Sequence, residues 1–235
     1  MRRFLARVVV IATYGYFWTL DYIYAGFWQL LGIVRRGDAR VFLTPTGTAK
    51  RSPVILIPGI YERWEFMKPI ARVLYHEGYP VHVIEGLGYN RGTVEAMANV
   101  VSTYVQEHNL RDCVIVAHSK GGLIGKQLLV QYEAQKIFRG MVAISAPFAG
   151  SRYAQLFPLR SLRMFIPDAP LLRALAKNDR VNARIVSIYP AFDPHIPGGS
   201  HLQGARNIQV QMYGHFRIIK DRRMHREIIK GMNKL

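Results

Sequence analysis

Three residues of the sequence have side chains that could together carry out nucleophilic catalysis: Ser119, Asp193 and His215. A serine hydroxyl is a poor nucleophile unless a base removes its proton. Histidine can act as that base near neutral pH, and a carboxylate can hold the imidazole in the required tautomer. The three residues are far apart in the chain, so the fold must bring them together for this chemistry to occur.

Each of these residues also has a simpler explanation. Ser119 lies in the glycine-rich stretch AHSKGGLIG, where a serine often only caps a helix. Asp193 precedes a proline and could be a turn aspartate, and His215 follows a glycine and could lie in a surface loop. Asp168 and Asp179 are rival candidates for the acid, although neither follows a predicted strand.

The elements that would have to position these residues alternate between strand and helix. Short segments rich in apolar residues predict six strands, at 54–57, 81–84, 114–117, 141–145, 185–189 and 208–212. Helical spacing of apolar residues predicts helices at 65–76, 94–106, 123–132 and 216–232. Continuous apolar strands between helices are typical of a parallel sheet covered on both faces, so we predict a doubly wound, mostly parallel α/β sheet of about six strands.

In such a sheet the reactive groups lie beyond the carboxyl ends of the strands. Ser119 directly follows the third predicted strand, Asp193 follows the fifth and His215 follows the sixth. The predicted topology therefore places all three candidates at one edge of the sheet.

The sequence around these residues resembles the α/β-hydrolase superfamily over about residues 53–233, and bacterial lipases and carboxylesterases in particular. The run Ala117-His118-Ser119-Lys120-Gly121 is similar to the G-x-S-x-G nucleophile elbow of that family, with alanine at the first position. The segments AISAPFAGS (143–151) and DPHIPGGSHLQGARNIQVQMYGH (193–215) also resemble family segments, and the order of serine, acid and histidine agrees.

The resemblance implies roles for individual residues. Ser119 would be the nucleophile, Asp193 the acid and His215 the base, and the backbone N–H groups of Ile60 and Lys120 would form the oxyanion hole. No cofactor is implied. We expect the side chain of Lys120 to be solvated, and His118 to be a packing or supporting residue.

The N-terminal stretch 8–34 is apolar, is flanked by arginines on both sides and contains one charged residue, Asp21. Three interpretations are open: a membrane anchor, a helix lying in the membrane interface or docked on protein, and a cleaved signal peptide. Asp21 disfavours a simple span, and its heptad spacing from Arg7, Tyr14 and Arg35 predicts a narrow polar stripe on one face.

We therefore divide the chain into an N-terminal membrane-associated segment (1–40) and a catalytic domain (41–235). Because every candidate catalytic residue lies beyond residue 52, deletion of residues 1–36 is expected to leave the turnover of a soluble ester nearly intact.

Residues 147–184 lie between the fourth and fifth predicted strands, where hydrolases insert a lid. Leucines and phenylalanines alternate there with arginines, as in LFPLRSLRMFIPDAPLLRALAK. This pattern is typical of a short amphipathic cap facing lipid, but a small cap packed on the sheet with solvated arginines would look the same.

Charge and composition limit the remaining choices. The 235 residues carry a net charge of +17, with +6 in residues 1–51, +5 in 147–184 and +5 in 216–235. This distribution suits an anionic membrane surface, and no nucleic-acid recognition motif is present. A single cysteine excludes an internal disulfide, and His195 and His201 near the acid have no carboxylate or cysteine set to make a metal site.

The sequence thus predicts a serine hydrolase that cleaves hydrophobic or lipid esters at a membrane, with the extracytoplasmic side favoured. An acyltransferase, a thioesterase or a peptidase on the same fold remains open, as does a non-catalytic membrane binding protein.

Overall fold

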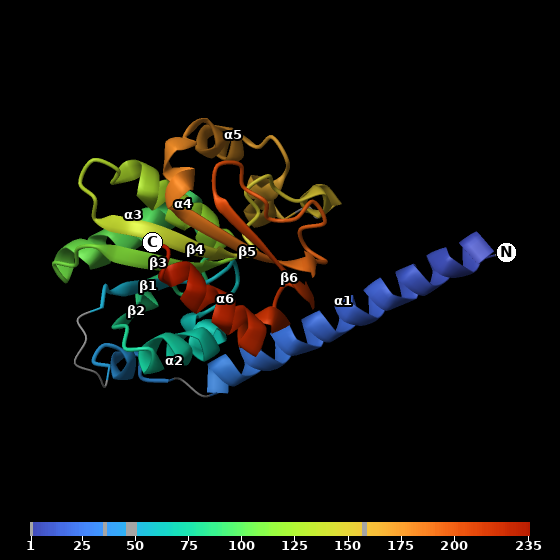
Figure 1. The fold of residues 1–235 in the computed structure, drawn as a ribbon, viewed down its shortest axis with the longest axis horizontal. Helices are drawn as coiled ribbons and strands as arrows, with labels where there is room; N and C mark the ends of the chain where they lie inside the picture. Colours follow the sequence, from blue (N-terminus) through green and yellow to red (C-terminus); the bar gives the residue numbers. More distant parts are fainter. Residues whose placement is uncertain (1, 35–36, 46–50, 157–158) are drawn as a thin grey trace.

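The computed structural model describes residues 2–34, 37–45, 51–156 and 159–235. Its centre is a six-stranded, fully parallel sheet with the strand order β2-β1-β3-β4-β5-β6 (Figure 1). The strands are β1 (Val54–Ile57), β2 (Val81–Val83), β3 (Cys113–His118), β4 (Phe138–Ile144), β5 (Ile185–Phe192) and β6 (Arg206–Tyr213). All six predicted strands are confirmed, with ends that shift by up to three residues.

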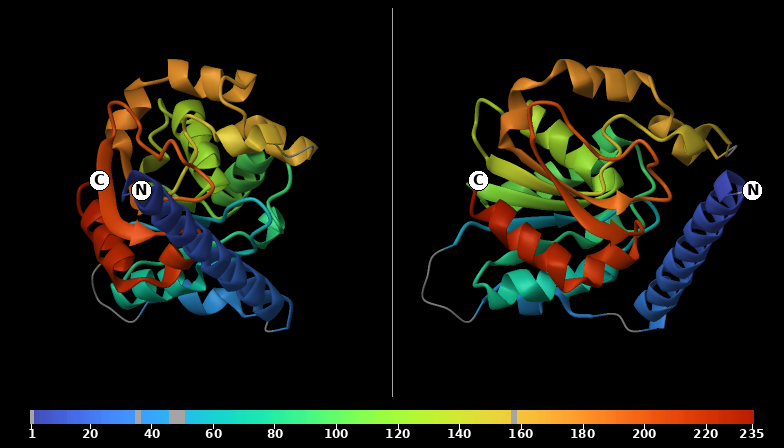
Figure 2. Two further views of the ribbon diagram at one scale, coloured as in Figure 1. Left: turned by 90° about the vertical axis from the view of Figure 1, so that its right-hand side faces the viewer. Right: turned by 45° about the vertical axis from the view of Figure 1, so that its right-hand side comes forward.

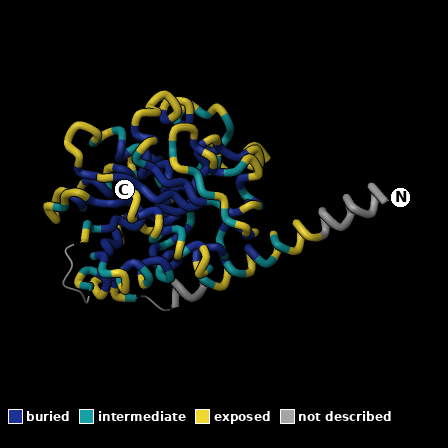
Figure 3. The backbone as a smooth tube through the Cα atoms, in the orientation of Figure 1, coloured by how far each residue is buried: buried dark blue, intermediate teal, exposed yellow. Residues whose placement is uncertain are grey.

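Helices cover both faces of the sheet, as predicted. Alternate residues of β1 point to opposite faces, so that Ile55 and Ile57 join one buried cluster while Val54 and Leu56 join the other. The first cluster includes α3 (Val94–Glu107) and α4 (Lys120–Gln131), and the second includes α2 (Lys68–His76) and α6 (Arg222–Met232). Strands β1 to β5 are mostly buried, whereas β6 at the edge of the sheet is largely intermediate or exposed (Figure 3).

The strand order reverses next to β1. The chain passes from β1 outward to β2 and then returns to the other side of β1 to form β3. In doubly wound sheets such a reversal opens a crevice beyond the carboxyl ends of the two strands. The residues that follow β1 and β3 include Ile60 and Ser119, so the topology places both at this crevice.

Three predicted helices begin at different residues in the structure. The predicted helix 65–76 starts with the 3₁₀ turn η2 (Trp64–Met67), and α2 begins only at Lys68. The predicted helix 216–232 is wrong at its start, because the chain forms a 3₁₀ turn, η7 (Arg217–Lys220), and is extended at Asp221 before α6 begins. The Asp221 carboxylate accepts the N–H of Arg223 at 2.8 Å, which caps α6 and explains the break. The predicted helix 123–132 begins earlier, at Lys120, because α4 starts directly after Ser119.

In its described residues, the segment 147–184 contains three 3₁₀ turns and the short helix α5 (Pro170–Lys177), which was not predicted. Phe165, Leu172 and Leu175 pack into the core on the α4 face of the sheet. Leu156 and Leu159 are 74% and 50% exposed. The apolar residues of this segment therefore serve two purposes, since some pack on the body and others face outward.

Part of the helix α1 (Arg2–Val34) lies against one side of the body, and its N-terminal end extends beyond the body (Figures 1 and 2). Tyr14 stacks on Phe192 with ring centroids 4.0 Å apart, and Phe17 stacks on Tyr213 at 4.7 Å. Asp21 is fully buried on the same side of the helix. The docking face thus contains positions 14 and 21 of the predicted heptad stripe, while aromatic residues elsewhere on α1 remain exposed.

Within the described part of the chain, no helix has a stretch both long and apolar enough to cross a bilayer.

Gly121, in the first turn of α4, allows this helix to approach β1 closely. A Cβ at Gly121 would lie 2.9 Å from the carbonyl oxygen of Pro58 and closer still to that of Ile57. We expect Gly121→Ala to lower the free energy of unfolding by about 1–3 kcal/mol, because the clash is with backbone that cannot move aside. Gly198→Ala is the matched control, since a Cβ at Gly198 meets no atom within 4 Å. Equal urea-denaturation midpoints for the two variants would contradict this account of the α4–β1 contact.

Candidate active site

Ser119 lies on a sharp turn between β3 and α4. Its backbone dihedral angles are φ 50° and ψ −121°, a conformation that costs a non-glycine residue about 1–3 kcal/mol. Hydrogen bonds on both sides stabilise the turn, because the N–H of Ser119 donates to Ile144 O and its carbonyl accepts the N–H of Gly122, both at 2.9 Å. The fold therefore imposes at Ser119 the strained strand-to-helix turn that the sequence resemblance implies.

Asp193 and His215 are brought together at the carboxyl ends of β5 and β6. The Nδ1 of His215 lies 2.7 Å from Oδ2 of Asp193, and both side chains are buried. The other carboxylate oxygen of Asp193 accepts the N–H groups of His195 at 2.8 Å and Ile196 at 3.0 Å. Since Nδ1 donates to this carboxylate, Nε2 of His215 is left as the ring nitrogen that can accept a proton.

Two irregularities of the backbone allow Asp193 and His215 to contact each other. The register of β5 against β6 shifts between Pro190 and Phe192, directly before Asp193, and such a shift re-aims the residues that follow it. Gly214 precedes His215 with φ 118°, which a residue with a side chain would rarely adopt.

His215 also lies beside the end of β3. Nε2 of His118, the residue before Ser119, is 3.0 Å from the carbonyl oxygen of His215, and the two imidazole rings are 4.9 Å apart. No hydrogen bond joins Ser119 to His215 among the described residues. Such bonds are often long without substrate and tighten in the complex. The structure therefore brings the acid and base into contact and places the base next to the turn that carries the serine.

Electrostatics favour the charged form of the pair. Burial opposes the charge on His215, but the carboxylate of Asp193, followed by those of Asp21 and Glu62, raises the pKa of His215 above its ordinary value. Burial likewise opposes the charge on Asp193, and its contacts with His215 and His195 lower the pKa of Asp193 below its usual range. An imidazolium that forms at His215 would thus be stabilised where it forms.

The two N–H groups expected to bind an oxyanion are free of protein acceptors. Neither the N–H of Ile60 nor that of Lys120 donates a hydrogen bond within the described residues. The N–H of Lys120 is in the first turn of α4, where the helix has unpaired donors and a favourable dipole for an anion. The neighbouring Gly59 N–H is already used, because it donates to Oε2 of Glu62 at 2.7 Å.

The side chain of Lys120 is not solvated, contrary to expectation. It is fully buried, and its Nζ donates to the carbonyl oxygens of Asn90 at 2.7 Å and Gly92 at 2.5 Å. Burial lowers the pKa of Lys120 to about 8. The ammonium group therefore fixes the loop after β2 against the start of α4, a long-range contact that local sequence does not reveal.

Glu62 and His118 form a second buried pair beside the candidate residues, and Glu62 was not singled out in the sequence. Oε2 of Glu62 lies 2.9 Å from Nδ1 of His118. Because the same oxygen accepts the Gly59 N–H and His118 contacts the backbone of His215, this pair connects the loop after β1 with the loop that carries His215. His118 is thus a supporting residue, as expected.

The rival acids lie elsewhere. Asp168 and Asp179 are exposed, and within the described residues no hydrogen bond joins either of them to His215. His201 is exposed as well. Among the described residues, no group of three or more histidine, cysteine or acidic side chains is arranged to hold a metal ion.

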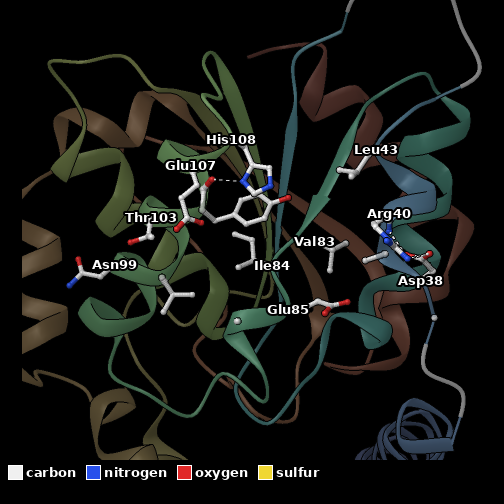
Figure 4. Close-up of a pocket in the computed structure, with 15 residues that line it drawn as sticks. Asp38, Arg40, Leu43, Val83, Ile84, Glu85, Asn99, Thr103, Glu107 and His108 are labelled. Atoms are coloured by element: carbon white, nitrogen blue, oxygen red, sulfur yellow. Dashed lines mark hydrogen bonds and ion pairs between the residues drawn. The ribbon is translucent and has the colours of Figure 1, made fainter.

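A groove of about 1160 Å³ opens at the β2 edge of the sheet, between α3 and the turn at residues 39–42 (Figure 4). Polar residues such as Asp38, Glu85 and Glu107 lie along it, but none of the five predicted site residues lines it. Its histidine, His108, is hydrogen-bonded through Nδ1 to the carbonyl oxygen of Tyr104 in its own helix. The groove is therefore separate from the candidate active site.

Solved structures share this fold at low sequence identity. The mature lipase BlEst2 of Bacillus licheniformis is 15% identical, with a TM-score of 0.58 over 80% of this chain and 94% of its own. A monoacylglycerol lipase of Paleococcus ferrophilus is also 15% identical, with a TM-score of 0.55 over 78% and 96%. An extracellular α/β-hydrolase from a Paenibacillus species is 20% identical, with a TM-score of 0.56 over 77% and 99%. At these identities the likeness establishes the fold alone.

No protein among those with curated descriptions matches the sequence. Residues 52–183, which include β1 to β4, the Ser119 turn and most of the segment before β5, match the family described as the alpha/beta hydrolase fold. Together with the six-stranded parallel sheet and its strand order, this match shows that the chain belongs to the α/β-hydrolase family.

Proposed function

We propose that this protein is a serine hydrolase that cleaves carboxylic esters through an acyl-enzyme. The observation that carries the proposal is the buried Asp193–His215 pair at the crevice where Ser119 occupies its strained turn. A binding protein would have no need to maintain a buried, hydrogen-bonded acid and base beside this turn. The lipase and monoacylglycerol lipase among the structural neighbours support an ester substrate.

In the proposed reaction, Oγ of Ser119 attacks the ester carbonyl carbon while Nε2 of His215 takes the hydroxyl proton. The N–H groups of Ile60 and Lys120 stabilise the negative charge on the former carbonyl oxygen. When the tetrahedral intermediate collapses, His215 returns the proton to the departing alcohol and the acyl group remains on Ser119. Water, deprotonated by His215, then releases the acid and regenerates the serine.

This mechanism has a defined dependence on pH. His215 must be neutral to accept the proton, so activity falls as pH decreases through the pKa of His215. Because that pKa is raised above its ordinary value, the acid limb of kcat/KM should lie above about pH 6.5.

A hydrophobic substrate met at an anionic membrane is the second part of the proposal. On α1, Tyr16 and Ile23 are each 62% exposed and Phe27 is 57% exposed, and Leu156 and Leu159 are exposed in the segment 147–184. These apolar side chains accompany a net charge of +17, which favours anionic lipid headgroups. We propose membrane association on this basis, with the extracytoplasmic side favoured.

Ser119→Ala should abolish ester hydrolysis while the fold is retained, because only the oxyanion donors and substrate binding remain. The measurement is kcat on a soluble p-nitrophenyl ester, with circular dichroism as the test of folding. Ser145→Ala is the matched control: Ser145 follows the neighbouring strand β4, also has a positive φ of 48°, and has a buried hydroxyl with no hydrogen-bond partner among the described residues. The nucleophile assignment is wrong if folded Ser119→Ala keeps more than a few per cent of kcat.

Asp193→Asn should reduce kcat by roughly 10⁴, because an amide favours the wrong tautomer of His215. Asp168→Asn is the matched control, since this exposed carboxylate has no contact with His215, and its kcat should stay within about tenfold of the unaltered protein. Both variants are assayed on the same soluble ester. A larger loss of kcat in Asp168→Asn than in Asp193→Asn would indicate that the catalytic acid is Asp168, in the segment before β5.

The membrane proposal predicts binding to vesicles that contain anionic lipid, weakened by added salt because the attraction is screened. Phe27→Ser should reduce the fraction that sediments with these vesicles several-fold. Val41→Ser is the control, because Val41 is equally exposed at 57% but lies outside α1. Equal sedimentation of the two variants, or no binding by the unaltered protein, would exclude α1 as the membrane contact.

A further inference from the structure

Asp21 is a fully buried carboxylate in the middle of α1, and it binds the loop that carries His215. Its two oxygens accept three successive backbone N–H groups, those of His215 at 2.8 Å, Phe216 at 3.0 Å and Arg217 at 3.0 Å. A buried carboxylate is costly unless it is hydrogen-bonded, and here the three donors come from a segment 194 to 196 residues away. The contact therefore links the N-terminal helix to the loop of the candidate base.

With this contact, His215 is held at its Nδ1, its carbonyl oxygen and its backbone N–H, and only Nε2 is left for the chemistry. Asp193 binds the imidazole at Nδ1, His118 binds the carbonyl oxygen, and Asp21 binds the backbone N–H. Gly214 makes the close approach of Asp21 possible, because a Cβ there would lie 2.7 Å from Oδ1 of Asp21. The position of the imidazole is thus fixed jointly by β5, β3 and α1.

The same face of α1 covers the ends of the two strands that precede the acid and the base. Tyr14 stacks on Phe192, the residue before Asp193, and Phe17 stacks on Tyr213, two residues before His215. Arg217, the last donor to Asp21, lies 4.8 Å above the ring of Phe17. Rings on α1 therefore hold the strand ends at which Asp193 and His215 are placed.

We propose that Asp21 is a positioning residue for His215, and that the docking of α1 completes the active site. The proposal rests on the serine hydrolase function proposed above. It replaces the expectation that residues 1–36 can be removed without loss of soluble-ester turnover, because that deletion would remove the carboxylate and leave three loop N–H groups without their acceptor.

Because Asp21 is negatively charged, the proposal predicts a specific change in the pH dependence of kcat/KM when this charge is removed. The ionisable groups that face His215 are Asp193, Asp21, Glu62, His118 and His195. Burial opposes protonation of His215, while Asp193, Asp21 and Glu62 raise its pKa. Removing the negative charge at Asp21 should therefore lower this pKa and move the acid limb of kcat/KM to lower pH.

The test compares Asp21→Asn with the unaltered full-length protein on a soluble ester across a range of pH. We expect kcat to fall at least tenfold with KM within about threefold, because the loop loses acceptors while the crevice is unchanged. The acid limb should move to lower pH. Asp21→Glu, which keeps the charge, should retain the acid limb of the unaltered protein.

Asp38→Asn is the matched control, because Asp38 is an exposed carboxylate in the described residues just after α1 and should leave kcat and the pH profile unchanged. An Asp21→Asn protein with unaltered kcat and acid limb would overturn the proposal. A loss of thermal stability with the acid limb unmoved would also overturn it, since that pattern indicates a merely structural role.

Hydrogen–deuterium exchange of the unaltered protein provides a test that does not require the variant to fold. The amides of residues 215–217 should be protected, and exchange at the rate of an open loop would contradict the contact. The two proposals fail differently: if the unaltered protein hydrolyses no ester, the proposed function fails, whereas an active protein indifferent to Asp21→Asn refutes the role of Asp21 alone.

Discussion

Asp193 and His215 face each other 2.7 Å apart at the ends of two neighbouring strands, with both side chains buried. Ionised groups in such a place must be compensated by hydrogen bonds and by each other. The loops around them supply this compensation: the N–H groups after Asp193, the imidazole of His118 and the carboxylate of Asp21 all bind this pair or its backbone. The loops at the carboxyl edge of the sheet are therefore arranged so that Asp193 and His215 keep their hydrogen-bond partners while buried.

The network extends from this pair to the loop expected to bind an oxyanion. Glu62 accepts the Gly59 N–H and contacts His118, which in turn binds the carbonyl of His215. Tyr61 in the same loop is hydrogen-bonded through its hydroxyl to Ser161 at 2.6 Å, in the segment before β5. These contacts connect that segment with the residues next to Ile60 and, through Glu62 and His118, with the backbone of His215.

The sheet, and the position of three candidate site residues at the ends of its strands, could be predicted from the sequence because the signals are local. An inner strand buried on both faces is an apolar run, and Ser119 and Asp193 follow strands of this kind. His215 follows β6, an edge strand in which apolar and polar residues alternate from Ile208 to Met212. The supporting contacts could not be predicted in this way. Hydrogen bonds to groups distant in sequence are made by the buried Lys120 ammonium, by Glu62 and by Asp21. No periodicity of the sequence indicates which carboxylate will accept which N–H group. For Asp21 there was a partial signal, since a lone charge in an apolar helix requires a partner, and its spacing from Tyr14 correctly predicted a shared face.

The proposed activation of Ser119 by His215 can be tested by treating the full-length protein with a fluorophosphonate, which reacts covalently with activated serines, and identifying the modified residue by mass spectrometry. One stoichiometric adduct is expected, on Ser119, and its rate of formation should fall as pH decreases through the pKa of His215. Ester hydrolysis by a protein that is not modified, or that is modified at another residue, would contradict the proposal.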